Sequence, residues 1–337
     1  MPPTFYFALG ARARPHDLAI AMLVGQRHYL APAGSSTARL LARTPGVHVV
    51  LDSWAFPPGN TDRPSLPRYA HMVAGWYARN LAGAAQPESP WLDWALSYDT
   101  IGDALASERD DARLRALLQA ICLCPDPPLV PVTHYPGPGA AAIIGDLLRD
   151  REECFDDEEI ALVRQRTAWG FHDEPDGPVD HPACAIGGLV PARYARAAAA
   201  WYEQLISDLE AAAELDPFQR RIHLLGIGKP SWVCCSPLVM SFDSSGPARM
   251  ALIGFERGIG AAYTADYGIS IAALRRSRSA RLAYHLIRYR AQVGLPWQPV
   301  DEALLHEDRE VAALPELADE RWEQPELPAA ALYASHM

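Results

Sequence analysis

The sequence predicts an α/β protein built as a (β/α)8 TIM-type barrel with insertions, and three observations support this fold class. Short apolar runs alternate with longer segments of helical periodicity along most of the 337 residues. The apolar runs are nearly continuous, which is typical of parallel strands buried on both faces. The length suits one barrel of about 250 residues that carries insertions. An open doubly wound sheet is the alternative, and we favour the barrel.

Seven strands are predicted from apolar, β-branched and aromatic runs bounded by turn residues. They cover 5–9, 47–52, 94–99, 129–134, 184–188, 222–228 and 238–243. An eighth strand is expected near 248–254. Helices are predicted over Ala-, Leu- and Arg-rich stretches such as 105–121 and 191–215. We assign 1–300 to a single barrel and 301–337 to an acidic C-terminal tail or helical extension.

The composition is typical of a soluble enzyme, because 49% of the residues are hydrophobic and 21% are charged. No run of about 18 uncharged apolar residues is present. The N-terminus lacks the charge-first order of a secretory signal, so we expect a cytoplasmic protein. No GxGxxG or Walker-type loop occurs, and no cofactor is expected.

Cysteine spacing gives no sign of a metal site. The six cysteines lie at 122, 124, 154, 184, 234 and 235. They show neither paired zinc-finger spacing nor a secreted disulfide framework. We therefore expect structural thiols in a reducing cytoplasm, and no bound metal.

Polar residues or glycines end most of the predicted strands. They are Asp52, Asp99, His134, Gly187 with Gly188, Gly226 to Lys229, and Asp243. In a parallel barrel the carboxyl ends of the strands meet on one face, where barrel enzymes place their active sites. A strand-final aspartate also suits a helix N-cap, but three of them are hard to explain by capping alone.

The strand ends form an ordered series of motifs. The series is LDSWAF (51–56), SYDTIGD (97–103), PVTHYPG (131–137), AIGGLVP (185–191), LLGIGKP (224–230) and SFDSSGPAR (241–249). It resembles the tRNA-guanine transglycosylase superfamily, especially the compact phage and bacterial members thought to place 7-deazaguanines in DNA. The strongest part of the resemblance is FDSSGPAR after LLGIGKP, because Asp243 and Arg249 keep the family's six-residue offset.

The resemblance implies a base exchange at the anomeric carbon of a nucleotide. Asp243 would be the nucleophile that attacks C1′ and displaces guanine, through an oxocarbenium-like transition state. Asp52 would be the acid and base that handles the proton on the departing or incoming base. Asp99 would accept hydrogen bonds from the base's N1–H and exocyclic amine.

Further residues are carried over for substrate binding. The backbone of Gly187, Gly188 and Leu189 would contact the base edge, with Gly226 nearby, since glycine permits close approach. Phe56 and Leu225 would sandwich the purine. Thr133 or His134 takes the place of the family's base-reading glutamine. Arg249 would hold a backbone phosphate.

Plainer alternatives stand beside these roles. Phe56 and Leu225 suit ordinary packing positions, and His134 suits a loop histidine. Asp103 suits either a partner of the site or a helix cap. Three further residues are expected to be structural or part of turns, although Lys229 also suits a phosphate contact: His181, His223 and Lys229.

Two departures from the family pattern bear on the substrate. The family's DSGGF is DSWAF here, which places Trp54 where the family has glycine. The tRNA enzymes carry a zinc module after the nucleophile, and no cysteine follows Cys235. We therefore favour DNA over tRNA, together with a free 7-deazaguanine base such as preQ0. An ATP-dependent helper protein is a further candidate partner.

The charge distribution leaves other substrates open. The formal net charge is −11, which argues against indiscriminate binding of nucleic acid. The segment 275–290 is nonetheless rich in arginine and free of acidic residues. Arg275, Arg276 and Arg278 are our candidates for phosphate contacts, and a solvated helix face is the alternative. A free nucleoside or nucleotide substrate, and a non-catalytic partner subunit, are the competing hypotheses.

Overall fold

The structure is a computed structural model. The described residues are 2–55, 60–83, 88–101, 103–122, 129–134, 181–182, 184–187, 207, 222–228, 238–253, 264 and 266–305. The predicted helix at 191–215 falls almost entirely outside these residues.

All of the described strands are parallel and belong to one sheet. In chain order they are β1 (Thr4–Ala8), β2 (His28–Pro32), β3 (His48–Asp52), β4 (Trp91–Leu96), β5 (Leu129–Val130), β6 (Val132–His134), β7 (Cys184–Gly187), β8 (Ile222–Leu224) and β9 (Val239–Ser244). The sheet runs β5-β4-β3-β2-β1-β9-β8-β7-β6. Its two outermost strands are therefore neighbours in sequence.

The segment 129–134 closes the barrel. Its first half, β5, pairs with β4, and its second half, β6, pairs with β7. Pro131 separates the two halves and has no N–H to donate to a ladder. Its carbonyl still accepts the amide of Ala185 at 2.8 Å, and the Val132 amide donates instead to the Ser97 hydroxyl at 2.9 Å. Counting this segment once gives eight parallel strands, as the (β/α)8 fold class requires.

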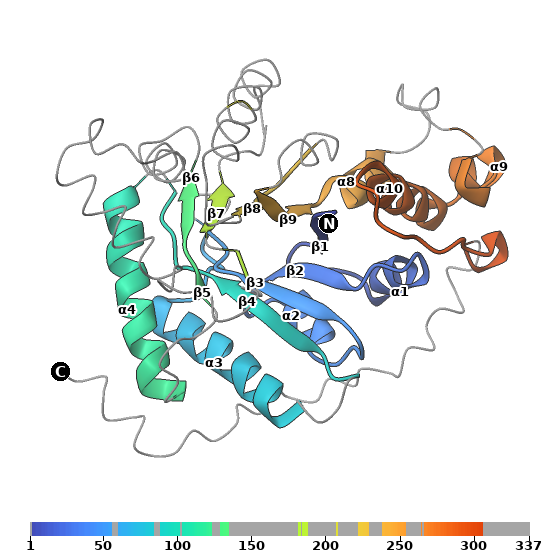
Figure 1. Cartoon of the computed structure of the whole chain (residues 1–337). Helices are drawn as coiled ribbons and strands as arrows, with labels where there is room; N and C mark the ends of the chain where they lie inside the picture. Colours follow the sequence, from blue (N-terminus) through green and yellow to red (C-terminus); the bar gives the residue numbers. More distant parts are fainter. Residues whose placement is uncertain are drawn as a thin grey trace.

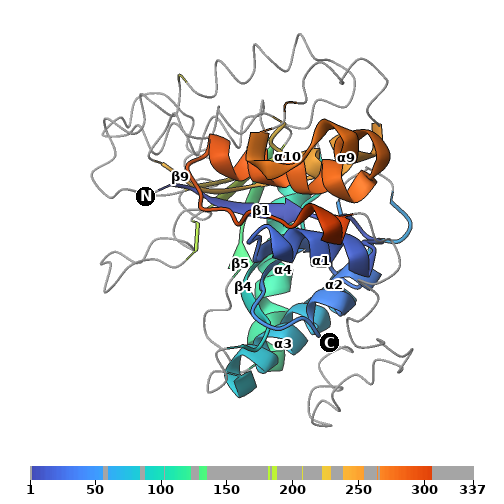
Figure 2. The same cartoon turned by 90° about the vertical axis from the view of Figure 1, so that its right-hand side faces the viewer.

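Helices cover the outside of the barrel (Figures 1 and 2). They are α1 (Pro15–Leu23), α2 (Ser36–Leu41), α3 (Leu66–Gly83), α4 (Ala104–Cys122), α8 (Gly246–Ile253), α9 (Ile271–Arg276) and α10 (Arg278–Gln292), with 3-10 turns η3 (Asp266–Gly268) and η4 (Glu302–Leu305). Helices α3 and α4 pack together on one side, and α8 and α10 pack together on the other. None of the helices among the described residues is long and apolar enough to cross a membrane.

The sequence prediction for the eighth strand is wrong. The eighth strand is β2 at His28–Pro32, and the segment proposed for it forms helix α8. Strand β2 is short and ends in proline, so its pattern is weak, although it is buried between β1 and β3. Gly246 and Pro247 mark a helix start, because proline is favoured in the first turn of a helix. The predicted helix at 105–121 is confirmed as α4.

Two apolar clusters hold the fold together. A small cluster fills the barrel interior, where Tyr6, Leu30, Val50 and Trp94 point inward from consecutive strands. A much larger cluster lies between the outer faces of the strands and the helices. Turn η4 belongs to this larger assembly, because Leu305 is buried and the Glu302 carboxylate accepts hydrogen bonds from Ser270. Residues 306–337 of the expected tail lie outside the described part.

Candidate active site

Three aspartates meet at the carboxyl end of the barrel. Asp52 is the last residue of β3, Asp99 follows the end of β4, and Asp243 lies near the end of β9. The pKa of Asp52 is raised by the charges of both Asp99 and Asp243, so both of these carboxylates lie close enough to Asp52 to act on it. The barrel topology thus unites residues that are far apart in sequence.

Asp52 has the properties of an acid that titrates near neutral pH. Burial away from water is the largest cause of the shift, and the neighbouring carboxylates add to it. A hydrogen bond from the backbone N–H of Trp54 and the charge of Arg63 act in the opposite direction. Together these effects raise the pKa of Asp52 from 3.8 to about 7. A carboxyl group poised there can both donate and accept a proton.

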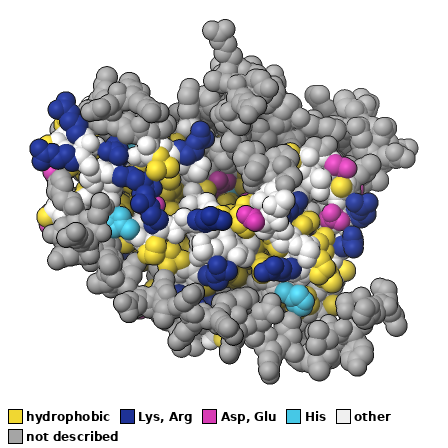
Figure 3. All heavy atoms as spheres, turned by 180° about the vertical axis from the view of Figure 1, so that it is seen from behind, with side chains coloured by type: hydrophobic (Ala, Val, Ile, Leu, Met, Phe, Trp, Pro, Cys, Tyr) yellow, Lys and Arg dark blue, Asp and Glu magenta, His cyan; other side chains and the backbone are white. Residues whose placement is uncertain are grey.

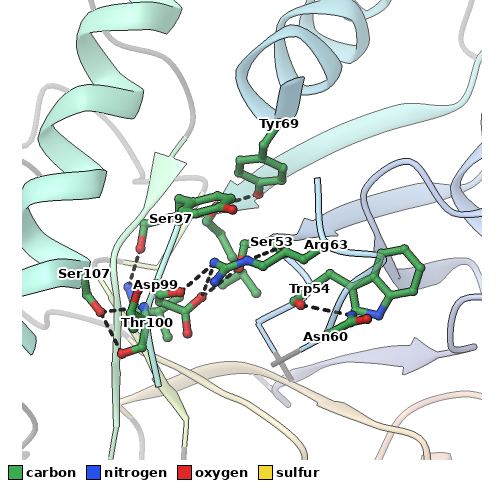
Figure 4. A network of polar contacts seen from close by, with 12 residues as sticks. Ser53, Trp54, Asn60, Arg63, Tyr69, Ser97, Asp99, Thr100 and Ser107 are labelled. Carbon is green, nitrogen blue, oxygen red and sulfur yellow. Dashed lines mark hydrogen bonds and ion pairs between the residues drawn. The ribbon is translucent and has the colours of Figure 1, made fainter. Parts of the chain in front are cut away.

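Trp54 shapes the loop that follows Asp52. Its φ is 65°, in the left-handed region that favours glycine. The position therefore suits the glycine found in the resembling family, and tryptophan is strained there. Its carbonyl accepts a hydrogen bond from Asn60 at 3.4 Å (Figure 4). Such strain at a site loop costs about 1–3 kcal/mol and persists only where the surroundings fix the backbone.

Asp99 is buried within a network of polar contacts (Figure 4). The Ser53 hydroxyl donates to Asp99 Oδ1 at 2.7 Å. The Arg63 guanidinium donates to the Asp99 carbonyl at 2.6 Å and to the Ser53 hydroxyl at 3.1 Å, and it lies 3.9 Å from Oδ1. Arg63 also sits over the Tyr98 ring, 3.8 Å from its centroid. The network joins the ends of β3 and β4.

The backbone under this network is fixed by buried side chains. The Tyr69 hydroxyl from α3 donates to the Leu96 carbonyl at 2.6 Å, at the end of β4. The Ser107 hydroxyl accepts from the Thr100 amide at 2.7 Å, in the turn that leads into α4. From the sequence, Asp103 is expected to be either a partner of the site or a helix cap. The residue is exposed and its carboxylate accepts a hydrogen bond from the Ala106 amide at 2.9 Å, so it caps α4.

Asp243 is held by a backbone donor and a buried histidine. The Gly226 amide donates to Asp243 Oδ1 at 2.9 Å. Gly226 has a φ of 71°, in the left-handed region that residues with a side chain rarely adopt. His223 Nε2 lies 3.4 Å from the same oxygen, and its Nδ1 is 2.8 Å from the Ser241 hydroxyl. His223 is fully buried against the edges of Tyr6 and Trp94, so its ring orientation is fixed.

Tyr289 from α10 contacts two of the sequence motifs, LLGIGKP (224–230) and SFDSSGPAR (241–249). Its hydroxyl donates to the Gly228 carbonyl at 3.0 Å, in the loop after β8. It also hydrogen-bonds Ser244, the residue after Asp243. A Cβ on Gly246 would lie 2.7 Å from the Tyr289 ring carbon Cζ, so this position admits only glycine without a shift. One outer helix therefore sets the spacing of both loops.

The other expected substrate-binding residues divide into two groups. Gly187 is buried at the end of β7 and lies two residues after Ala185, so it faces the barrel interior as Ala185 does. Leu225 packs against the interior cluster. His134 ends β6, where its backbone pairs with Gly187. Arg249 lies on α8 and is exposed. Three residues lie outside the described part of the chain: Phe56, Gly188 and Leu189.

The arginine-rich segment has mixed environments. Arg275 and Arg276 are exposed at the end of α9. Arg278 instead forms a bidentate salt bridge with Asp17, in which Nη1 donates to Oδ1 and Nη2 donates to Oδ2 at 3.0 Å. Asp17 lies in the first turn of α1, which follows β1, so the pair marks this segment as lying towards the carboxyl end of the barrel. Figure 3, which shows the molecule from behind, has Lys and Arg side chains spread over one broad face, with fewer Asp and Glu side chains among them.

One cluster among the described residues has metal-ligand chemistry. His28, His48 and Asp93 each present a ligand atom, and these atoms lie within 4.8 Å of one another. Burial lowers the pKa of His28 to about 4, whereas the hydrogen bond to Asp93 raises the pKa of His48. The cluster lies at the amino-terminal end of the barrel, opposite the aspartates. No sequence pattern predicted it.

Residues that sequence reasoning missed share one property. Arg63 and His223 reach the aspartates from other elements, and Tyr289 reaches Gly228 and Ser244 in the neighbouring loops. No short motif contains both partners of any of these contacts. His223 alone had a usable signal, because it shares inward parity with Asp243 on the adjacent strand. Comparison with known proteins finds no matching family and no matching curated protein. The assignment of function therefore rests on the sequence motifs and on this geometry.

Proposed function

We propose that the chain is a base-exchange transglycosylase that replaces guanine in nucleic acid with a 7-deazaguanine. One observation carries the proposal: Asp52, whose pKa is raised to about 7, lies near enough to Asp243 to respond to its charge, and both are at the carboxyl end of a (β/α)8 barrel. Two carboxyl groups in different environments are the arrangement that retaining glycosyl transfer needs, one as acid and base and the other as nucleophile.

In the first half-reaction, the Asp243 carboxylate attacks C1′ of the target nucleotide. The bond from C1′ to N9 breaks as the ester bond forms, and its electron pair leaves with guanine. Asp52, in its protonated form, supplies the proton that neutralises the departing base. The Gly226 N–H and His223 hold the Asp243 oxygen in place, which lowers the cost of orienting the nucleophile.

In the second half-reaction, the Asp52 carboxylate accepts the N9 proton of the incoming 7-deazaguanine. N9 then attacks C1′, and the ester to Asp243 breaks to regenerate the free carboxylate. Each proton donated by Asp52 is thus returned in the same cycle. No cofactor is needed for this balance.

Asp99 supplies the recognition of the base. Its carboxylate accepts the N1–H and exocyclic amine, two donors that adenine does not present together. The hydroxyl of Ser53 and the nearby guanidinium of Arg63 keep the Asp99 carboxylate oriented. Leu225 offers one apolar surface to the purine ring.

Single-stranded or locally opened DNA is the substrate we favour. The chain has no cysteines after Cys235 to build the zinc module of the tRNA enzymes. A nucleotide must leave the base stack to reach a barrel mouth, and unstacking costs a few kcal/mol. A helper protein that uses ATP to open the duplex would fit this requirement.

A free nucleoside is the second candidate substrate. The observation that favours it is the net charge of −11, which opposes binding of a polyanion. The chemistry at Asp52 and Asp243 would be unchanged. The two substrates separate by salt dependence, because binding of a neutral nucleoside changes little with ionic strength.

The deciding experiment measures incorporation of radiolabelled guanine into single-stranded DNA, duplex DNA and bulk tRNA. Wild type is compared with Asp243→Asn, which keeps the shape but cannot form the ester. Asp103→Asn is the matched control, because this aspartate also follows a strand but only caps α4. We expect label in single-stranded DNA with wild type and Asp103→Asn, and none with Asp243→Asn.

Other outcomes would change the conclusion in defined ways. Label in tRNA alone would keep the chemistry and replace the substrate. Exchange of the base on a free nucleoside, with no label in any polymer, would favour the second candidate. An Asp243→Asn variant as active as wild type would refute the proposal.

A further inference from the structure

The end of the barrel opposite the aspartates carries a second cluster of polar side chains. His28 begins β2, His48 begins β3, and Asp93 lies early in β4. Their ligand atoms lie within 4.8 Å of one another. The cluster is therefore built by three consecutive strands and not by a flexible loop.

Strand parity shows that the cluster faces the barrel axis. His28 is two residues before the inward-facing Leu30, and His48 is two residues before the inward-facing Val50. The pairing of β3 with β4 shifts between Val49 and Val50, which leaves Asp93 as an extra residue in β4. Such a bulge redirects a side chain and is a common device beside functional sites.

The cluster is separate from the proposed active site. His48 and Asp52 are the two ends of β3, so their Cα atoms lie about 13 Å apart at about 3.3 Å per residue. Tyr6, Leu30 and Trp94 fill the barrel between them. A ligand at one end therefore does not touch a ligand at the other.

The side chains are already arranged around one point. His48 Nδ1 lies 2.8 Å from Asp93 Oδ1. The His28 and His48 rings are stacked, with centroids 4.7 Å apart and planes at 23°. The Tyr6 hydroxyl donates to the other Asp93 oxygen, Oδ2, at 2.7 Å. That bond orients the carboxylate from behind and leaves Oδ1 directed at the histidines, as outer partners do in metal sites.

The donor set selects a class of ligand. Two imidazoles and one carboxylate suit Zn²⁺ and similar divalent transition metals, whereas Mg²⁺ and Ca²⁺ prefer oxygen donors alone. Tetrahedral ligands at about 2.0–2.2 Å from one ion lie about 3.3–3.6 Å from one another. Atoms at the observed limit of 4.8 Å would therefore have to approach by about 1.5 Å at most, which rotation of the side chains can supply.

We propose that His28, His48 and Asp93 form a binding site for a divalent transition-metal ion of the zinc class. The His48 side chain is 45% exposed, so the ion has access from solvent and water completes its coordination. The metal would replace the proton shared by His48 and Asp93 and would tie β2, β3 and β4 together. Its effect is on the stability of the barrel, independent of the transglycosylase chemistry.

The test uses the full chain, freed of metal by a chelator and titrated with Zn²⁺ by calorimetry. The variants are His28→Gln, His48→Gln and Asp93→Asn, and the matched control is His71→Gln on the exposed face of α3. We expect each cluster variant to bind one equivalent fewer than wild type, and the control to bind as wild type. Counting the difference separates this site from any contribution of the cysteines elsewhere in the chain. Equal stoichiometry in all proteins would overturn the proposal.

A second measurement needs no variant and so does not depend on the variants folding. Diethyl pyrocarbonate modifies accessible histidines, and mass spectrometry locates the modified residues. We expect Zn²⁺ to protect His28 and His48 at least fivefold, while the modification of His71 stays unchanged. Zn²⁺ should also raise the unfolding temperature of wild type. Unchanged modification of His28 and His48 at saturating Zn²⁺ would refute the site.

Discussion

At the scale of single residues, Asp52 shows how a barrel mouth changes the chemistry of an ordinary side chain. The same carboxyl group in the unfolded chain is ionised above about pH 4, whereas in the folded protein it holds its proton to about pH 7. The folded state therefore binds more protons than the unfolded state between these values. Its stability falls as the pH rises through this window.

We predict that Asp52→Asn stabilises the protein at pH 8 but has little effect at pH 4. The variant removes a carboxylate whose ionisation is costly in the folded state, and this cost is complete only above about pH 7. We expect a gain of about 1–3 kcal/mol. This is less than the full shift implies, because Asp52 lies largely within the barrel mouth but keeps some contact with solvent, which screens its charge. Urea unfolding at both pH values measures it. A gain that is equal at pH 4 and pH 8 would contradict the assigned shift.

The neighbours of Asp52 should move its pKa in opposite directions. Asp99→Asn removes a negative charge and should lower the pKa of Asp52, whereas Arg63→Met removes a positive charge and should raise it above about 7. Carboxyl carbon NMR of Asp52 reports both values directly, without a substrate. Arg115→Met, on α4 and absent from the groups that shift Asp52, is the control and should leave the titration unchanged. Shifts of the same sign in both variants would exclude the electrostatic explanation.

Backbone strain at Trp54 makes a further prediction. Trp54→Gly should be more stable than Trp54→Ala by about 1 kcal/mol, because only glycine adopts φ 65° without strain. At Trp91, on strand β4, the same pair of substitutions should rank in the opposite order. Thermal unfolding of the four variants gives both differences. Alanine ranking above glycine at both positions would show that Trp54 is not strained.

At the scale of elements, the site depends on packing between loops and one outer helix. Helix α10 places Tyr289 against the loop after β8 and the turn after β9. These two turns belong to the motifs LLGIGKP and SFDSSGPAR, and the sequence gives the order of these motifs along the chain but not the distance between them in space. Their distance in space is set by α10, which comes about forty residues after Asp243 along the chain.

We predict that Gly246→Ala destabilises the protein by about 1–3 kcal/mol, because the added Cβ meets the Tyr289 side chain. Tyr289→Leu shortens that side chain and should be destabilising by itself. The two costs should be less than additive in the double variant, because leucine makes room for the methyl group. Denaturant unfolding of the four proteins gives the coupling energy. Strict additivity would show that the contact does not restrict this position. Gly75→Ala, in α3 and with open space around the position, is the control and should not destabilise.

At the scale of the whole molecule, closure of the barrel and net charge act on function together. The segment around Pro131 closes the ring and so brings the ends of β3, β4 and β9 to one face. The total charge of −11 repels a polyanion, so any polymer substrate must be held by a few local arginines. Arg249, Arg275 and Arg276 are exposed and are the candidates for these contacts.

We predict a shallow dependence of single-stranded DNA binding on salt. Each phosphate that an arginine neutralises contributes about 0.7 to the slope of log K against log salt for a single strand. Arg249→Gln, and the pair Arg275→Gln with Arg276→Gln, should each reduce the slope by about 0.7 for every phosphate that the variant no longer binds. Arg43→Gln is the control, because it lies between α2 and β3 at the amino-terminal end of the barrel. Fluorescence anisotropy at several salt concentrations measures the slopes. An unchanged slope in all variants would exclude these arginines from phosphate binding.

The fold class, most strands and the three aspartates could be predicted from the sequence alone. Parallel strands buried on both faces leave a strong apolar signal, and the residues at their carboxyl ends must share one face. The prediction failed at β2 and α8, because His28–Pro32 has a weak pattern while 248–254 is apolar enough for either element. The substrate and the reaction stay predictions from the motifs.

Features that depend on contacts between distant segments became visible only in the folded chain. Arg63 beside Asp99, His223 beneath Asp243, and the histidines near Asp93 each join residues on different elements. The raised pKa of Asp52 likewise comes from burial away from water and from the charges of Asp99 and Asp243, which lie near the ends of other strands. Local patterns encode periodicity and turn chemistry, whereas burial and electrostatic neighbours arise only after the barrel closes.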